Sequence, residues 1–151
     1  NSKKNFNKFL QILLNHKYRN YISSDFSFTQ NKELGYMTHF FFYQNVVRKY
    51  YEKFFLPNQK FSKLIKKMDA KIFTNYYFKT ERLEKDLKLF LKKNKIRLKQ
   101  FKDFDKNSTK MNLDKNYKNF FSQKNLELIE KKENYLFQKF KYKKISNINK
   151  K

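Results

Sequence analysis

Basic residues dominate the side chains of this chain that could bind a ligand. Lys and Arg account for 37 of its 151 residues against 13 Asp and Glu, which gives a formal net charge of +24. A surface this basic attracts nucleic acid, anionic lipid or acidic polysaccharide. An AT-rich coding sequence would also place many Lys and Asn at tolerant positions, where they act only as solubilising residues. The high positive charge therefore has two possible explanations, a polyanion partner or a biased composition.

Residues for metal, disulfide or phosphate-loop chemistry are scarce. The sequence has no Cys, which excludes disulfides and thiolate metal sites. Its two histidines, His16 and His39, stand far apart and outside any spaced metal-ligand signature, so we expect no metal site. The single glycine, Gly35, lies inside a helical pattern. No glycine-rich loop that could hold a phosphate can therefore be drawn.

Helical periodicity accounts for most of the apolar residues. Apolar side chains recur at the three- and four-residue spacing of one helix face, and Pro57 ends the longest pattern. Thr80 and Ser122 each precede such a pattern and could cap a helix through a side-chain oxygen. The predicted helices cover residues 5–15, 32–55, 59–68, 80–95 and 122–140. Residues 16–30 show no period and predict a loop.

One segment has the composition of a strand. Residues 71–78 read KIFTNYYF, a short run rich in β-branched and aromatic residues. Bulky residues would stand on both faces, which is typical of a strand inside a sheet. A single strand leaves its backbone donors and acceptors unpaired. We therefore expect either that partner strands lie outside this chain or that the fold is essentially helical.

The remaining stretches are polar. Residues after Lys95 up to about Asn119 predict an extended loop, and residues 143–151 predict a basic, fraying tail. The predicted domain spans residues 1–142. No stretch approaches the 18 apolar residues of a membrane span, and no signal peptide is visible. The cellular location stays open.

The strand and the helix after it resemble a known family. The string KIFTNYYFKTERLEKDLKLFL, residues 71–91, is similar to the late strand and helix of sulfotransferases, in which an aromatic strand ends in Glu and is followed by Leu-Glu-x-Asp-Leu. Upstream, the Leu-Gly-Tyr-Met-Thr run that begins at Leu34 resembles a helix of some bacterial-type members. Downstream, Asn107-Ser108, an aromatic pair and a Lys- and Glu-rich helix follow the family's usual order, although Lys141 replaces its usual Gly.

The resemblance implies a carbohydrate-type sulfotransferase. Such enzymes transfer a sulfuryl group from 3′-phosphoadenosine 5′-phosphosulfate to a hydroxyl, here of a carbohydrate or polysaccharide acceptor. Their donor-gripping loop, with a Lys and small residues, precedes the region that is similar here, so we expect a C-terminal fragment without catalytic residues. The implied fold is α/β and mostly helical, with one clear strand at 71–78. The implied donor-binding residues are Thr80 and Glu81, near the adenine, and Asn107 and Ser108, near the nucleoside.

An alternative function remains open, and so do local structural roles for the implied donor site. A basic RNA-binding or organellar ribosome-associated protein would use Lys for phosphate attraction and aromatics for base stacking. Against it, the aromatics fall on helical apolar faces, where core packing explains them. For the four residues of the implied donor site the alternatives are local: a helix cap for Thr80, a favourable first-turn charge for Glu81 and a turn for Asn107-Ser108.

Overall fold

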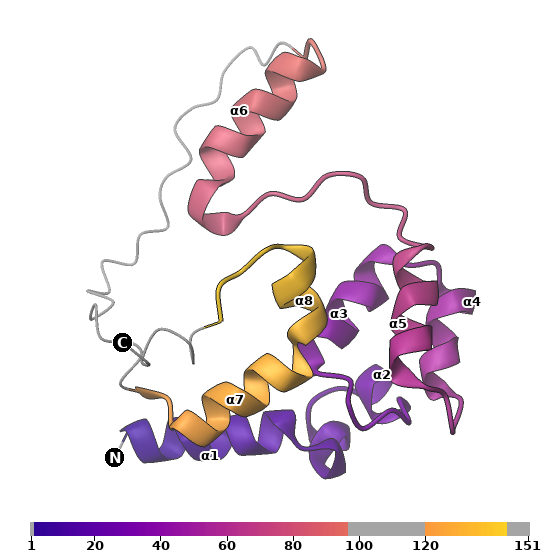
Figure 1. Cartoon of the computed structure of the whole chain (residues 1–151), viewed down its shortest axis with the longest axis vertical. Coiled ribbons are helices and arrows are strands. Elements are labelled where there is room, and N and C mark those ends of the chain that lie inside the picture. Colours follow the sequence, from indigo (N-terminus) through magenta and orange to yellow (C-terminus); the bar gives the residue numbers. More distant parts are fainter. Residues whose placement is uncertain (1, 97–119, 145–151) are drawn as a thin grey trace. The chain divides into compact units, whose positions relative to one another are not determined.

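The computed structural model describes residues 2–96 and 120–144, and the chain divides into two compact units (Figure 1). The first unit comprises residues 1–73 and 116–151, and the second comprises residues 74–115. The described residues are mostly helical, as the apolar periodicity predicts. Strand-type pairing among them is limited to one isolated antiparallel bridge between Val46 and Ile72.

Helices and 3-10 turns build the first unit. In chain order they are α1 (Ser2–Leu14), η1 (His16–Tyr21), α2 (Ser24–Ser27), α3 (Tyr36–Asn45), α4 (Arg48–Tyr51), η2 (Glu52–Phe55), α5 (Phe61–Asp69), α7 (Gln123–Lys132) and α8 (Asn134–Lys139). Their buried apolar side chains form a core of Phe26, Leu34, Phe42, Val46, Tyr51, Phe54, Leu64 and Met68. Burial of apolar surface is the main force that holds such short helices, because helices of this length are marginal in isolation.

α1 confirms the helix predicted at 5–15 and lies alongside α7 in Figure 1. Leu10 and Leu14 are its buried positions. The side-chain amide of Asn125 on α7 donates to the Asn7 backbone carbonyl at 3.0 Å and to Asn7 Oδ1 at 2.8 Å. Asn7 Oδ1 also accepts from the Ser122 backbone N–H at 2.7 Å. Contact between these two helices is therefore both apolar and polar.

The single long helix predicted over residues 32–55 is wrong. The chain forms α3, then α4 and η2, with a break at Val46, whose backbone is extended at φ −129° and ψ 138°. The amide of Asn45 bonds to the Phe41 carbonyl at 2.8 Å, which satisfies an acceptor at the helix end. Val46 then pairs with Ile72. A β-branched residue with a tertiary pairing partner thus overrides the helical period.

The final predicted helix also proves to be two. Ser122 caps α7 as expected, since its side chain accepts from the Asn125 backbone N–H at 3.2 Å. α7 ends before Glu133, and α8 begins at Asn134. Glu133 is buried and is held by contacts with α3, described below. The polar stretch predicted as a loop lies mostly outside the described residues, as does most of the tail.

The strand predicted at 71–78 is not formed, which corrects the α/β expectation for the described chain. Ile72 makes the bridge to Val46, and the Phe73 backbone N–H donates to the Asn45 carbonyl at 3.1 Å. Beyond this point, backbone hydrogen bonds to other described residues are missing at Thr74, Asn75, Tyr76 and Phe78. A strand needs a neighbour over its whole length to satisfy these groups, and the described chain offers one for two residues only.

The second unit contains η3 (Thr80–Arg82) and α6 (Leu83–Lys93). Thr80 does not cap the helix, because the residues at the two N-cap positions, Lys79 and Arg82, precede η3 and α6 without a side-chain cap bond. Phe90 of α6 packs edge-on against Tyr76 at 4.6 Å and Phe78 at 5.6 Å between ring centroids. α6 has no buried residue in the described structure, so its predicted apolar stripe is only partly covered.

Candidate functional site

The predicted donor-binding residues fall on the second unit or outside the described chain. Thr80 lies in η3, where it is exposed, and its hydroxyl makes no hydrogen bond with another described residue. Glu81 follows in the same turn. Asn107 and Ser108 lie outside the described residues. Of these four residues, the described structure therefore places only Thr80 and Glu81 together, and they are adjacent in sequence.

A buried carboxylate, which the sequence analysis missed, holds the start of α3. Glu133 accepts from the Met37 and Thr38 backbone N–H groups at 3.0 and 2.8 Å and from the Thr38 hydroxyl at 2.7 Å. Burial raises the pKa of Glu133, and the hydrogen bonds from Thr38 and Met37 oppose that rise. These donors are the unpaired N–H groups of a helix start, where negative charge is favoured. Glu133 therefore acts as a cap supplied from the α7–α8 junction.

Gly35 makes room for that carboxylate. A Cβ atom at this position would overlap the Glu133 carboxyl group. The backbone of Gly35 is in the extended region at φ −82°, so no special conformation requires glycine here. Close approach explains it instead. The Leu-Gly-Tyr-Met-Thr run is thus a helix start with space for a carboxylate. In the sequence, the single glycine in this run was the feature that could have indicated this close approach.

Arg19 is a buried cation held by neutral oxygens. One of its terminal nitrogens donates to the carbonyl and the hydroxyl of Thr29, both at 2.8 Å. The other donates to the carbonyls of Asn31 and Leu34 at 2.7 and 2.9 Å. Burial lowers the pKa of Arg19 to about 10, and the guanidinium stacks on Phe26 at 4.4 Å from the ring centroid. These bonds fix the loop between α2 and α3.

His39 and Tyr51 form a buried pair inside the aromatic core. Tyr51 Oη is hydrogen-bonded to His39 Nδ1. Burial lowers the pKa of His39 to about 4 and raises the pKa of Tyr51. At neutral pH the imidazole is therefore neutral and the phenol protonated, so the tyrosine donates. Rings of Phe26, Tyr36 and Tyr43 lie around the histidine, which makes this pair a packing element and not an exposed acid–base site.

Asp69 joins α5 to α8. It accepts from the Tyr135 hydroxyl at 2.5 Å and from the Lys139 ammonium at 2.7 Å. Burial by itself would raise the pKa of Asp69, but the hydrogen bonds from Lys139 and Tyr135 outweigh it and leave the pKa below its ordinary value. The cluster is partly exposed. It links two helices that are far apart in sequence.

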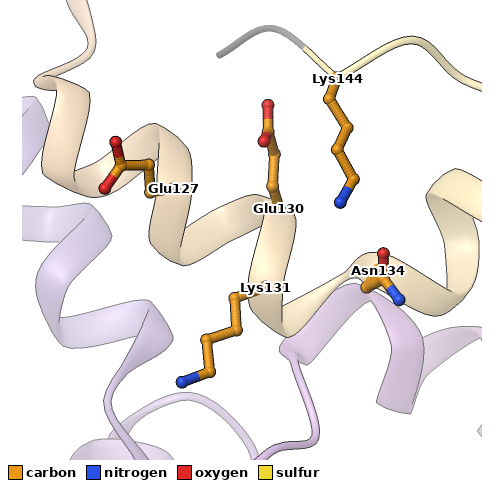
Figure 2. A pocket seen from close by; sticks show the side chains of 5 residues that line it. All are labelled: Glu127, Glu130, Lys131, Asn134 and Lys144. Atoms are coloured by element: carbon orange, nitrogen blue, oxygen red, sulfur yellow. The ribbon is translucent and has the colours of Figure 1, made fainter. Parts of the chain in front are cut away.

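A shallow hollow of about 430 Å³ lies along α7 and the residues after α8 (Figure 2). Its lining comprises Glu127, Glu130, Lys131, Asn134 and Lys144. Figure 2 shows that Glu130 and Lys131 point to opposite sides of α7. The lining combines two carboxylates, two ammonium groups and one amide, which Figure 2 shows at separate places along the helices. The hollow is therefore a weak candidate for a catalytic centre, since catalytic groups must converge on one reacting atom.

Residues 2–96 and 120–144 hold no group of three or more His, Cys, Asp or Glu placed to bind a metal ion. No helix in the same ranges is long and apolar enough to cross a membrane.

Comparisons with known proteins add no relative. The chain matches no protein-family model, and neither a curated protein nor a solved structure is significantly similar to it.

Proposed function

We propose that this chain is the C-terminal part of a carbohydrate sulfotransferase domain, and that the donor-gripping part is not among its 151 residues. The proposal rests on the order of motifs along the sequence, from the Leu-Gly-Tyr-Met-Thr run to the final Lys- and Glu-rich helix. The alternative is a basic RNA-binding or organellar ribosome-associated protein, which rests on the positive charge and the many aromatic residues.

The observation that carries the proposal is the state of residues 72–79. The segment has an extended backbone at both ends, at the Ile72 bridge and at Lys79 with φ −78° and ψ 133°. Between these ends, the backbones of Thr74, Asn75, Tyr76 and Phe78 make no hydrogen bond to another described residue, and the side chains of Phe73 and Tyr76 are 60% and 49% exposed. Exposed aromatics on an extended segment whose backbone ladder is incomplete are expected of a sheet strand when its neighbours are lacking. The sulfotransferase resemblance assigns a strand to this place.

The helix after the segment also agrees with the resemblance. η3 and α6 follow directly, with Glu84 and Asp86 in the first turn of α6. Thr80, at the junction, presents a hydroxyl that no other described residue engages. It fits the role of a hydrogen-bonding group for the adenine of the donor, with Glu81 beside it. Asn107 and Ser108 would complete the nucleoside side.

The proposed reaction moves one sulfuryl group. The bond between sulfur and the bridging oxygen of 3′-phosphoadenosine 5′-phosphosulfate breaks, and a bond forms between sulfur and the acceptor hydroxyl oxygen. The hydroxyl proton is released, and adenosine 3′,5′-bisphosphate leaves with the bridging electron pair. Stabilising the charge on that leaving oxygen is the task of the donor-gripping loop. The residues of this chain would position the nucleoside and the acceptor.

Two experiments test the proposal. Sequencing of the coding region upstream should reveal a strand followed by a Lys-containing phosphate loop within about 100 residues; its absence would defeat the assignment. The protein encoded by that longer frame should transfer a radiolabelled sulfuryl group from the donor to a polysaccharide. Steeply salt-dependent binding of RNA, with no binding of the donor, would favour the nucleic-acid alternative instead.

A further inference from the structure

Three lysines gather around one tyrosine ring on the first unit. The ammonium groups of Lys49, Lys53 and Lys71 lie 5.2, 5.7 and 5.1 Å from the centroid of the Tyr50 ring. All three lysines are exposed. They come from α4, from η2 and from the residues that follow α5. We call this set the Tyr50 lysine cluster.

The cluster is assembled by the tertiary structure. Lys49 and Lys53 stand on consecutive turns, but Lys71 arrives from α5, whose Leu64 and Met68 pack in the same core as Tyr51 and Phe54. The bridge between Val46 and Ile72 fixes the register of that approach. Partly buried Ile72 packs against the core, and its neighbours Lys71 and Phe73 are exposed.

Among the described residues, none of these three ammonium groups forms a salt bridge. The acidic residues nearest to them in sequence pair with other cations: Glu52 with Arg48 at 3.0 Å and Asp69 with Lys139 at 2.7 Å. The tyrosine ring offers each ammonium a weak attraction. Since all three lie within about 6 Å of one centroid, they repel one another over a distance no greater than about one Debye length, where salt screens only partly. An anion bound between them would relieve it.

We propose that the Tyr50 lysine cluster binds the sulfate groups of an anionic polysaccharide. This inference rests on the proposed function, because a carbohydrate that accepts sulfuryl groups becomes a polyanion as the reaction proceeds. Ammonium groups on flexible stems suit sulfate esters at variable positions, whereas planar recognition of phosphate would favour Arg. The one arginine nearby, Arg48, is occupied by Asp25 and Glu52. The Tyr50 ring is surrounded by the three ammonium groups and is only partly exposed. It is therefore unsuited to stacking on a nucleic-acid base.

The test is binding of heparin, a sulfated polysaccharide, to the full chain at several salt concentrations. The variant K49Q/K53Q/K71Q should lose about tenfold in affinity at 0.15 M salt, with a shallower dependence of binding on salt. A matched control, K3Q/K4Q/K8Q, removes three exposed lysines of α1 and should change the affinity by less than about twofold. K49R/K53R/K71R, which keeps the charge, should retain most of the binding.

Two results would overturn the site. Equal losses of heparin affinity in the two glutamine variants would mean that heparin binding depends on net charge alone. Tighter binding of a single-stranded RNA of equal charge would assign the cluster to nucleic acid. Circular dichroism of each variant establishes that it is folded, and the charge-preserving variant separates lost charge from lost fold. If the longer protein fails to transfer the sulfuryl group but the lysine variants weaken heparin binding as expected, the proposed function is wrong and the polysaccharide-binding site stands.

Discussion

Glu133 fixes two parts of the first unit with one buried side chain. Its carboxylate closes the N-terminal end of α3 from the junction between α7 and α8, nearly a hundred positions later in the sequence, as the three bonds to Met37 and Thr38 show. Gly35 supplies the space. Removing one partner of such a buried set leaves the others unsatisfied, which costs more than the bonds contribute.

Replacement of Glu133 by Gln tests this cap. Glu133→Gln keeps the size but turns one acceptor oxygen into a donor, facing N–H groups that need an acceptor. We expect a loss of about 2 kcal/mol in the free energy of unfolding, measured by urea denaturation.

Gly35→Ala should cost a similar amount, about 1–3 kcal/mol, because the carboxylate must move. Exposed Glu127 provides the control, and Glu127→Gln should change stability by less than about 0.5 kcal/mol; equal effects at both positions would contradict the cap.

His39 makes stability depend on pH. Its pKa in the folded chain is about 4, below the ordinary value of 6.5, because burial disfavours the charged ring. The unfolded state therefore binds a proton first as the pH falls, and stability present above the ordinary value is lost as the pH drops towards the folded pKa. We expect the free energy of unfolding to fall by on the order of 3 kcal/mol across this window.

The measurement is urea unfolding at a series of pH values, with His39→Gln as the comparison. The glutamine cannot titrate, so the slope between those two pH values should flatten in the variant although its overall stability is lower. His16, whose pKa is also lowered by burial, remains in both proteins. An unchanged slope would show that His39 is not the responsible group.

Among the elements, residues 72–79 are the segment whose conformation depends most on neighbours. Within residues 2–96 and 120–144, Ile72 pairs with Val46 and Phe73 with Asn45, whereas the backbones of Thr74, Asn75, Tyr76 and Phe78 make no hydrogen bond. Where sequence and structure disagree here, the physical reason is that β pairing is non-local. Composition can give a segment the preference for a strand, but a ladder needs a second strand to supply its donors and acceptors.

Amide hydrogen exchange tests this reading. In the 151-residue chain, the amides of Thr74, Asn75, Tyr76 and Phe78 should exchange nearly as fast as in an unfolded peptide, whereas those of Leu64 and Met68 in α5 should be protected. In the longer protein that the proposed function calls for, the four amides should become protected by about a thousandfold or more as strands pair with them. Fast exchange in both proteins would argue against a sheet at this place.

The whole molecule carries far more positive than negative charge, with a formal net value of +24. Ion pairs between described residues are few and mostly exposed, and such pairs contribute little to stability. Self-repulsion therefore opposes the compact state. The same repulsion is what a polyanion would relieve, at the Tyr50 lysine cluster or elsewhere on the surface.

Stability should accordingly rise with ionic strength. Between about 0.02 and 0.3 M KCl the Debye length shrinks from about 20 Å to under 10 Å, and we expect the melting temperature to increase by several degrees. Calorimetry or circular dichroism at matched pH measures the shift. A neutral sugar at equal osmolarity serves as the control for solvent effects. A melting temperature that falls with KCl would show that attractive ion pairs outweigh the repulsion.

The sequence by itself determined the local features of this chain. Helical class, the faces of α1 and α5 and the Ser122 cap follow from spacing and side-chain chemistry within a few residues, which act before any tertiary contact forms. The first turn of α6 is acidic for the same local reason. The Thr80 cap, also a local prediction, failed because the chain enters α6 through η3.

Only the tertiary structure decided where elements end and which distant residues meet. The break at Val46 depends on Ile72, the split before α8 accompanies the burial of Glu133 against α3, and Lys71 reaches Tyr50 because α5 packs in the core. Each of these contacts joins residues far apart in sequence. Their energies come from burial and from pairing of polar groups in space, and neither quantity is written in local periodicity.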